Sequence, residues 1–139
     1  MDKINRIIDA NCNRTREGLR VIEEIIRFWL ENAPSFHTIK QLRHHFTALE
    51  TQIRSQLTHV MTARQSDQDV GKHYIPNLEA NRTDIVSLAE ANCRRVEESL
   101  RVLEEFLKLT DVTVIKEVKE LRFTIYELEK HLKHELTQQ

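Results

Sequence analysis

The sequence has few residues that interrupt helices. Only two glycines and two prolines occur among its 139 residues, and Leu, Glu, Arg, Lys, Ala and Ile dominate. Such a composition is typical of helix-rich soluble proteins. The scarcity of glycine also excludes the two common nucleotide cradles, the G-x-x-x-x-G-K-[ST] loop and the G-x-G-x-x-G turn.

Charge of one sign and long apolar runs are also lacking. The 22 acidic residues nearly balance the 21 basic ones, so no overall field favours nucleic acid or an anionic membrane surface. No apolar run approaches the roughly 20 residues that span a bilayer, and the N-terminus has no apolar signal core. We therefore expect one cytoplasmic domain with no nucleic-acid or membrane partner.

Familiar metal-site patterns are missing. The chain has no H-E-x-x-H, no Cys/His zinc spacing and no paired Glu-x-x-His pattern of di-iron bundles. The histidine pairs His44-His45 and His131/His134 are expected on the surface.

What the sequence does contain is an internal duplication. The fifteen residues from Ala10 to Glu24 return from Ala91 to Glu105 with ten identical letters, and the motif at 42–50 returns at 121–129. The period of about 80 residues is too long for a solenoid repeat. Because two similar hairpins can bury their apolar stripes on each other, we predict an all-α, four-helix bundle of two duplicated helical hairpins with pseudo-twofold symmetry.

The duplication divides the chain into a first repeat at 1–62, a crossover loop at 63–81 and a second repeat at 82–139. Apolar spacing predicts helices at about 2–32, 35–62, 82–109 and 111–137. Pro34 or Ser35 is expected to open the second helix, Thr83 or Asp84 the third and Asp111 the fourth. The first apolar stripe consists of Ile4, Ile8, Thr15, Ile22, Ile26 and Trp29.

The two cysteines, Cys12 and Cys93, occupy the same position in each repeat. In a reducing compartment small buried thiols are expected rather than a disulfide.

Polar residues repeat inside the apolar stripes. Asn11 and Asn92 fall in the middle of the stripe, where an unpaired amide costs about 1–3 kcal/mol, so each should bond to the other or face something polar. Gly18 and Ser99 lie on the same arc and leave room for a ligand. The edge of each arc carries an arginine and a glutamate, namely Arg14 and Glu17 in the first repeat and Arg95 and Glu98 in the second.

A groove with arginines and carboxylates suits a phosphorylated ligand with Mg²⁺. The guanidinium fork matches phosphate, whereas a carboxylate repels it unless a cation intervenes. The alternative is that Arg14–Glu17 and Arg20–Glu24 are ordinary helical ion pairs worth a few tenths of a kcal/mol. We favour this alternative for Arg20, Glu23 and Glu24, which fall on the outer half of the wheel.

The crossover adds further charged residues without a core-forming pattern, and a long ordered crossover is more often a functional loop than a spacer. Gly71 beside Asp69 would let backbone amides and a carboxylate approach a phosphate–metal cluster. A plain turn is the equal alternative for this D-V-G sequence. We expect the crossover to close over the groove; its other candidate residues are Arg64, Glu79 and Arg82.

Combined, the motifs resemble a small helical family of thiamine biosynthesis that occurs alone or as an N-terminal extension of thiamine-phosphate synthase. The resemblance covers nearly the whole chain and rests on I-x-D-A-N-x-x-R-x-R-E-G-L-R-V-x-E-E, the A-R-x(4)-D-V-G crossover with its E-x-x-R, and A-N-x-x-R-V-E-E-x-L-R-V-L-E-E. Gln65 and Lys72 depart from the family pattern, which has an acid and a small hydroxyl residue at these positions.

This resemblance implies a hydroxymethylpyrimidine phosphate kinase that uses ATP and Mg²⁺ to make the diphosphate consumed by thiamine-phosphate synthase. The expected ligand is a phosphorylated pyrimidine, and the expected partner is the synthase. Catalysis would fall to Arg14, Arg95 and Asp69, and the metal to Asp69, Glu17 or Glu98. Substrate binding would fall to Asn11, Glu17, Arg64, Gly71, Glu79, Arg82, Asn92 and Glu98.

Two other classes stay open: a non-catalytic helical module that docks on the synthase and channels its substrate, and a purely structural module that forms a homodimer. Synthase activity itself is excluded, since in that family it uses a (β/α)₈ barrel, for which this chain has neither the length nor the strand pattern.

Overall fold

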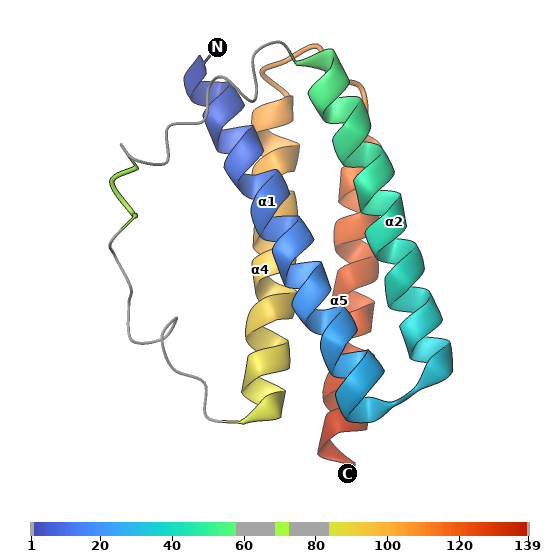
Figure 1. The fold of residues 1–139 in the computed structure, drawn as a ribbon. Helices are drawn as coiled ribbons and strands as arrows, with labels where there is room; N and C mark the ends of the chain where they lie inside the picture. The colour runs from blue at the N-terminus through green and yellow to red at the C-terminus, as the bar shows by residue number, and fades with distance from the viewer. Residues whose placement is uncertain (1, 58–68, 73–83, 139) are drawn as a thin grey trace.

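Four long helices make up the described part of the chain. The computed structural model describes residues 2–57, 69–72 and 84–138, and all regular elements within these ranges are helical (Figure 1). The helices are α1 (Asp2–Glu24), which continues as the π-helical turn η1 (Ile25–Leu30), α2 (Ala33–Gln56), α4 (Ile85–Leu107) and α5 (Ile115–Thr137). The predicted all-α bundle is confirmed.

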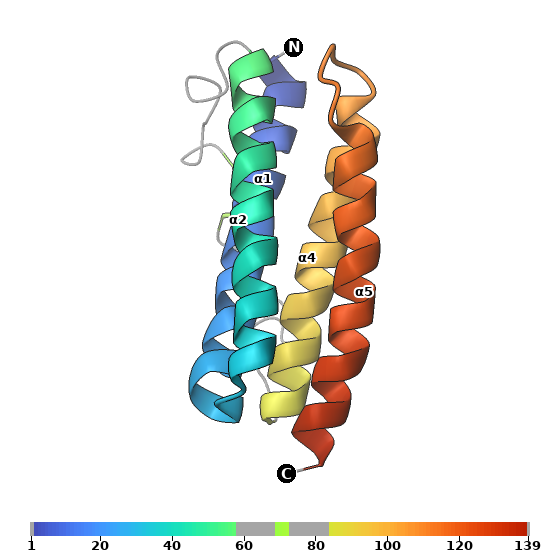
Figure 2. The ribbon, with the colours of Figure 1, turned by 90° about the vertical axis from the view of Figure 1, so that its right-hand side faces the viewer.

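The bundle consists of two antiparallel hairpins. Figure 2 shows α1 beside α2 and α4 beside α5, and the two hairpins meet mainly where α1 packs against α4. The buried positions recur every three or four residues, so each helix turns one apolar side inward. The resulting core includes Ile8, Ile22, Phe46, Leu100 and Ile125.

One member of the predicted first stripe lies outside the core. Ile22 and Ile26 are buried as expected, but the Trp29 residue is 57% exposed. The reason is the π-helical turn, which has more residues per turn than an α-helix and therefore rotates the positions that follow it. Placing Trp29 in the apolar stripe was wrong.

The capping residues of α2 and α4 follow ordinary helix chemistry. The Asn32 side chain accepts a hydrogen bond from the Ser35 backbone N–H at 3.0 Å, with Pro34 in the first turn. At the start of α4 the Asp84 side chain accepts from the Ser87 N–H at 2.8 Å and the two residues form a capping box. The expected helix starts at Pro34/Ser35 and Asp84 are confirmed to within two residues, while Thr83 lies outside the described residues.

The fourth helix begins later than predicted. Asp111 does not cap it; the N-cap is Val114, without a side-chain hydrogen bond. Val112 and Val114 are each 4% exposed, because the chain uses these residues to close one end of the core before the helix starts. The second helix is described as far as Gln56, so its predicted continuation to residue 62 lies largely outside the described residues.

None of the helices in the described ranges combines the length and the apolar character needed to cross a membrane.

Candidate functional site

The interface between α1 and α4 is close and partly polar. The hydroxyl groups of Thr15 and Ser99 lie 2.6 Å apart in the buried contact between the hairpins. A Cβ atom added at Gly18 would stand 2.6 Å from Val96 Cγ2 and 3.2 Å from the Asn92 carbonyl oxygen. Gly18 therefore permits the close approach of the helices rather than leaving an open space for a ligand.

Both repeated asparagines face this interface. Asn11 is 4% exposed and Asn92 is partly buried. They do not bond to each other: the Asn11 side-chain amide donates to the Ile7 carbonyl at 2.8 Å, and that of Asn92 donates to the Leu88 carbonyl at 2.9 Å. The Asn11 Oδ1 accepts from Arg14 at 3.4 Å. The predicted inward position is confirmed, with backbone carbonyls as the polar partners.

A hollow of about 740 Å³ lies beside α1 and is bounded across from it by the C-terminal half of α4. Its volume falls in the range of small-molecule sites, which is about 300–1,000 Å³. The lining residues are Lys3, Arg6, Ile7, Asp9, Ala10, Asn11, Asn13, Arg14, Glu17, Asp69, Val102 and Phe106.

Four of the predicted site residues meet at this hollow: Asn11, Arg14, Glu17 and Asp69. Their counterparts in the second repeat, Asn92, Arg95 and Glu98, are not among the lining residues. Of the three carboxylates predicted as alternative metal ligands, Glu17 and Asp69 line the hollow and Glu98 does not. Nowhere in ranges 2–57, 69–72 and 84–138 do three His, Cys, Asp or Glu side chains form a group that could hold a metal ion.

The described part of the crossover is a short turn. Asp69 Oδ1 accepts a hydrogen bond from the Gly71 N–H at 2.8 Å, and the Lys72 N–H donates to the Asp69 carbonyl at 3.1 Å. Gly71 has no positive φ, so the turn interpretation of D-V-G fits these residues. The other crossover candidates, and with them the predicted closure over the groove, lie outside the described residues: Arg64, Glu79 and Arg82.

The lining residues that sequence reasoning missed include two basic residues of α1 and two apolar residues of α4. Lys3 and Arg6 precede Arg14 along the same side of α1, at the helical spacing that could have revealed them. Neither makes a hydrogen bond or ion pair within the described part of the chain. Val102 and Phe106 come from α4, and only the antiparallel packing of the two repeats places them there.

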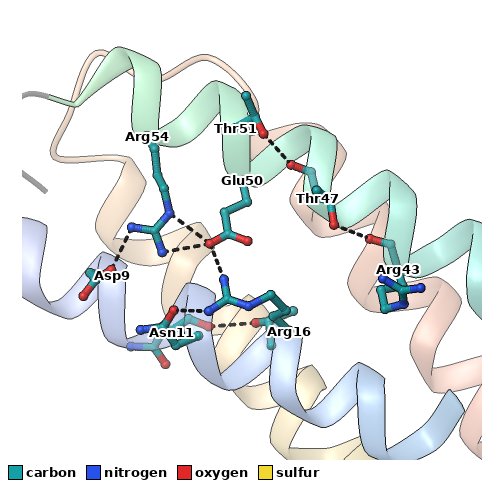
Figure 3. A network of polar contacts seen from close by, with 10 residues as sticks. Asp9, Asn11, Arg16, Arg43, Thr47, Glu50, Thr51 and Arg54 are labelled. Atoms are coloured by element: carbon teal, nitrogen blue, oxygen red, sulfur yellow. Dashed lines mark hydrogen bonds and ion pairs between the residues drawn. The ribbon is translucent and has the colours of Figure 1, made fainter. Parts of the chain in front are cut away.

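A network of ion pairs holds the adjoining side of α1 against α2 (Figure 3). Arg54 contacts Asp9 at 2.7 Å and Glu50 at 2.8 Å, and Arg16 contacts the same Glu50 at 2.6 Å. Because Asp9 is thereby neutralised by α2, the unpaired charges at the hollow are the cations of Lys3, Arg6 and Arg14 and the carboxylates of Glu17 and Asp69.

The second repeat lacks one cation of this network. The ion pair of Lys133 with Glu90, at 3.0 Å, is equivalent to that of Arg54 with Asp9. The position equivalent to Arg16, however, is occupied by Glu97, and the Glu97 carboxyl lies against Glu129. Burial, followed by the hydrogen bond to Glu129 and the charge of Glu129, raises the pKa of Glu97 to about 8. One oxygen of each carboxyl is buried without a hydrogen-bond partner, so the pair is best satisfied when it holds a proton.

Arg20 forms the helical ion pairs expected of it, at 3.2 Å from Glu23 and 3.4 Å from Glu24. The outward position predicted for Glu23 was wrong, since this residue is 3% exposed and also bonds to Arg43 of α2 at 3.2 Å. The second repeat has the same arrangement with Glu104 and Arg122. Arg14 and Glu17 form no ion pair with each other.

Both cysteines are free and fully buried, as expected. Burial raises the pKa of the Cys12 thiol to about 12 and raises that of Cys93 as well. These thiols are core side chains rather than nucleophiles.

Comparison with known proteins gives relatives for nearly the whole chain. A protein named thiamine-phosphate synthase from Synechocystis sp. is 46% identical over 129 residues, which are 93% of this chain and 36% of that protein. Proteins of the same name from Thermosynechococcus vestitus and Nostoc punctiforme are 42% and 40% identical and covered to 35%. The chain thus spans about a third of the length of these curated relatives.

These relatives correct one expectation. The resemblance implied a hydroxymethylpyrimidine phosphate kinase, but the relatives carry the name of a synthase, and the region that they share with this chain is about a third of a longer protein. The assignment as a phosphotransferase was therefore wrong: it came from analogy between motifs, which does not establish a reaction. ATP and Mg²⁺ as ligands stay predictions.

No solved structure matches the chain. A family model does match, over residues 6–131, and its description is the ThiD2 family. Since this match covers both repeats and includes most of the hollow, the chain belongs to the ThiD2 family.

Proposed function

We propose that this chain is a non-catalytic helical module of thiamine biosynthesis that works with thiamine-phosphate synthase and holds a phosphorylated pyrimidine for it. Support for the partner comes from the relatives, in which the matched region is about a third of a protein with the synthase's name. The module's task is to bind the ligand and keep it near the synthase, which performs the reaction.

The observation that carries the proposal is the hollow beside α1. Three cations, Lys3, Arg6 and Arg14, line one cavity of about 740 Å³ together with apolar residues of α4. Cations without an acidic partner favour an anionic guest, and a guanidinium can bind two phosphate oxygens at once. The Arg14 guanidinium donates a hydrogen bond to Asn11 Oδ1 at 3.4 Å. This contact limits the directions in which the guanidinium can point.

Binding is tested by isothermal titration calorimetry with hydroxymethylpyrimidine phosphate. Arg14→Gln should weaken binding about 10- to 100-fold, because a hydrogen bond to a charged group contributes about 1.5–3 kcal/mol. Arg95→Gln changes the counterpart on α4, which does not line the hollow, and should change Kd less than twofold. Lys130→Gln on the exposed side of α5 is the neutral control.

The partnership is tested by adding the chain to thiamine-phosphate synthase at limiting pyrimidine substrate. We expect higher turnover with the parent chain and none of this gain with Arg14→Gln. Absence of binding by the parent chain at millimolar ligand, or equal losses in Arg14→Gln and Arg95→Gln, would contradict the proposal.

A further inference from the structure

The two halves of the chain have diverged at the first turns of α1 and α4. Counting 81 positions from one repeat to the next, Lys3 corresponds to Asp84 and Arg6 to Ser87, whereas Arg14 corresponds to Arg95. The start of α1, beside the hollow, therefore carries two cations. The equivalent positions at the start of α4 carry an acid and a hydroxyl group.

The residues at the start of α4 serve a structural purpose. Asp84 and Ser87 bond to each other's backbone N–H groups in a capping box. The hydrogen bond from the Ser87 N–H is the main cause that lowers the pKa of Asp84, so this carboxyl is ionised at neutral pH. A phosphate at this end of the second groove would meet a negative charge and no cation from the first helical turn.

The first turns of α1 carry the opposite charge. Lys3 and Arg6 line the hollow and make no hydrogen bond or ion pair with other described residues. They are three residues apart, so their side chains project from neighbouring points on one face of the helix. Two adjacent cations without an acidic partner fit one phosphate group.

The opposite wall of the hollow is apolar. Phe106 and Val102 of α4 line it, one helical turn apart and both partly buried. Because α4 runs antiparallel to α1, Thr15 meets Ser99 and Phe106 lies across from the N-terminal half of α1. Phe106 thus brings an aromatic ring to the hollow that the two cations also line.

From these positions we infer that the duplicated chain binds one ligand rather than two, a phosphate ester of a flat ring. The phosphate lies among the cations of the hollow, foremost Lys3 and Arg6, and the ring lies against Phe106 and Val102. This inference rests on the proposed function, which locates the site at the hollow. It adds the orientation of the ligand, the number of ligands per chain and the residues that contact the ring.

The test compares three probes by calorimetry on the full chain: inorganic phosphate, phenyl phosphate and hydroxymethylpyrimidine phosphate. We expect one molecule of phenyl phosphate per chain. Arg6→Gln should weaken phenyl phosphate and inorganic phosphate alike, by about tenfold. Phe106→Ala should weaken phenyl phosphate roughly three- to tenfold and leave inorganic phosphate unchanged.

The ratio of the Kd values of the two probes, measured in one variant, distinguishes loss of the ring contact from partial unfolding. Partial unfolding would weaken the binding of both probes equally. Val102→Ala provides a second, smaller change in the same wall, and Phe123→Ala on the exposed face of α5 is the control. Two molecules per chain, or unchanged binding of phenyl phosphate in Phe106→Ala, would overturn the inference. Binding of phenyl phosphate as expected, with no preference for the pyrimidine phosphate, would instead contradict the proposed function and leave this inference standing.

Discussion

At the scale of single residues, the exchange of Arg16 for Glu97 separates the two repeats most clearly. Arg16 neutralises Glu50 at 2.6 Å in the first repeat, whereas Glu97 faces Glu129 in the second. Arg94 approaches Glu129 only to 4.0 Å. The second hairpin therefore carries a partly buried acid pair where the first carries an ion pair.

This pair makes the stability depend on pH. With a pKa of about 8 in the folded protein against an ordinary 4.5, Glu97 binds a proton more tightly when folded. Its contribution is complete below about pH 4.5 and is lost as the pH rises toward 8, on the order of a few kcal/mol. Urea unfolding of the parent and Glu97→Gln between pH 5 and 8.5 should show a fall only in the parent; the exposed Glu105→Gln is the control. Parallel curves for parent and Glu97→Gln would contradict the prediction.

The same site predicts a stabilising substitution. Glu97→Arg rebuilds the arrangement of the first repeat opposite Glu129, and a hydrogen bond to a charged group contributes about 1.5–3 kcal/mol. We expect a higher melting temperature at pH 8, where about half of the parent molecules have lost the proton of this pair. Arg16→Glu, which would introduce the acid pair into the first repeat, should lower the melting temperature at the same pH. An unchanged or lower value for Glu97→Arg would show that the guanidinium cannot reach Glu129.

At the scale of helices, the contact between α1 and α4 depends on Gly18. Alanine favours helices by about 1 kcal/mol over glycine, yet its Cβ would stand 2.6 Å from Val96 Cγ2. We expect Gly18→Ala to lower the free energy of unfolding by about 1–3 kcal/mol, since overpacking outweighs propensity here. Val96→Ala in the same chain should recover part of the loss. A stabilised Gly18→Ala variant in chemical denaturation would show that the helices separate easily at this point.

The sequence alone predicts the helices because their apolar spacing and their caps are local features. Asp84 is the clearest example, as its capping box lies within four residues. The late start of α5 and the exposed Trp29 could not be predicted in this way. Burial of Val112 and the π-helical turn both depend on how the ends of the bundle close, which is a tertiary effect.

The candidate site was predictable only on the α1 side. Asn11 and Arg14 are marked by their repetition, whereas Lys3 and Arg6 do not repeat and could be found only from their spacing along α1. Phe106 belongs to the other half of the chain, so its place at the hollow follows from the antiparallel packing of α1 on α4. The internal repeat therefore predicts the fold, but it gives no information on the site residues in which the two halves differ.

At the scale of the whole molecule, the two thiols report on the integrity of the core. Cys12 and Cys93 are both 0% exposed, one in each hairpin, and burial raises the pKa of both. Ellman's reagent at pH 8 should therefore react slowly with the native protein and rapidly with both thiols in urea. Fast reaction of one thiol without denaturant would show that its hairpin opens independently of the other.

The buried hydrogen bond between Thr15 and Ser99 also bears on the origin of the molecule. These side chains lie on equivalent faces of α1 and α4, so the inner face of each hairpin is covered by a near copy of itself. An ancestral gene encoding one hairpin would have yielded this architecture as a pair of identical subunits, with two identical grooves. When two such hairpins are joined in one chain, their grooves no longer have to stay alike. The two halves now differ at the starts of their first helices. The start of α1 carries cations that line the hollow, and the start of α4 carries a capping box.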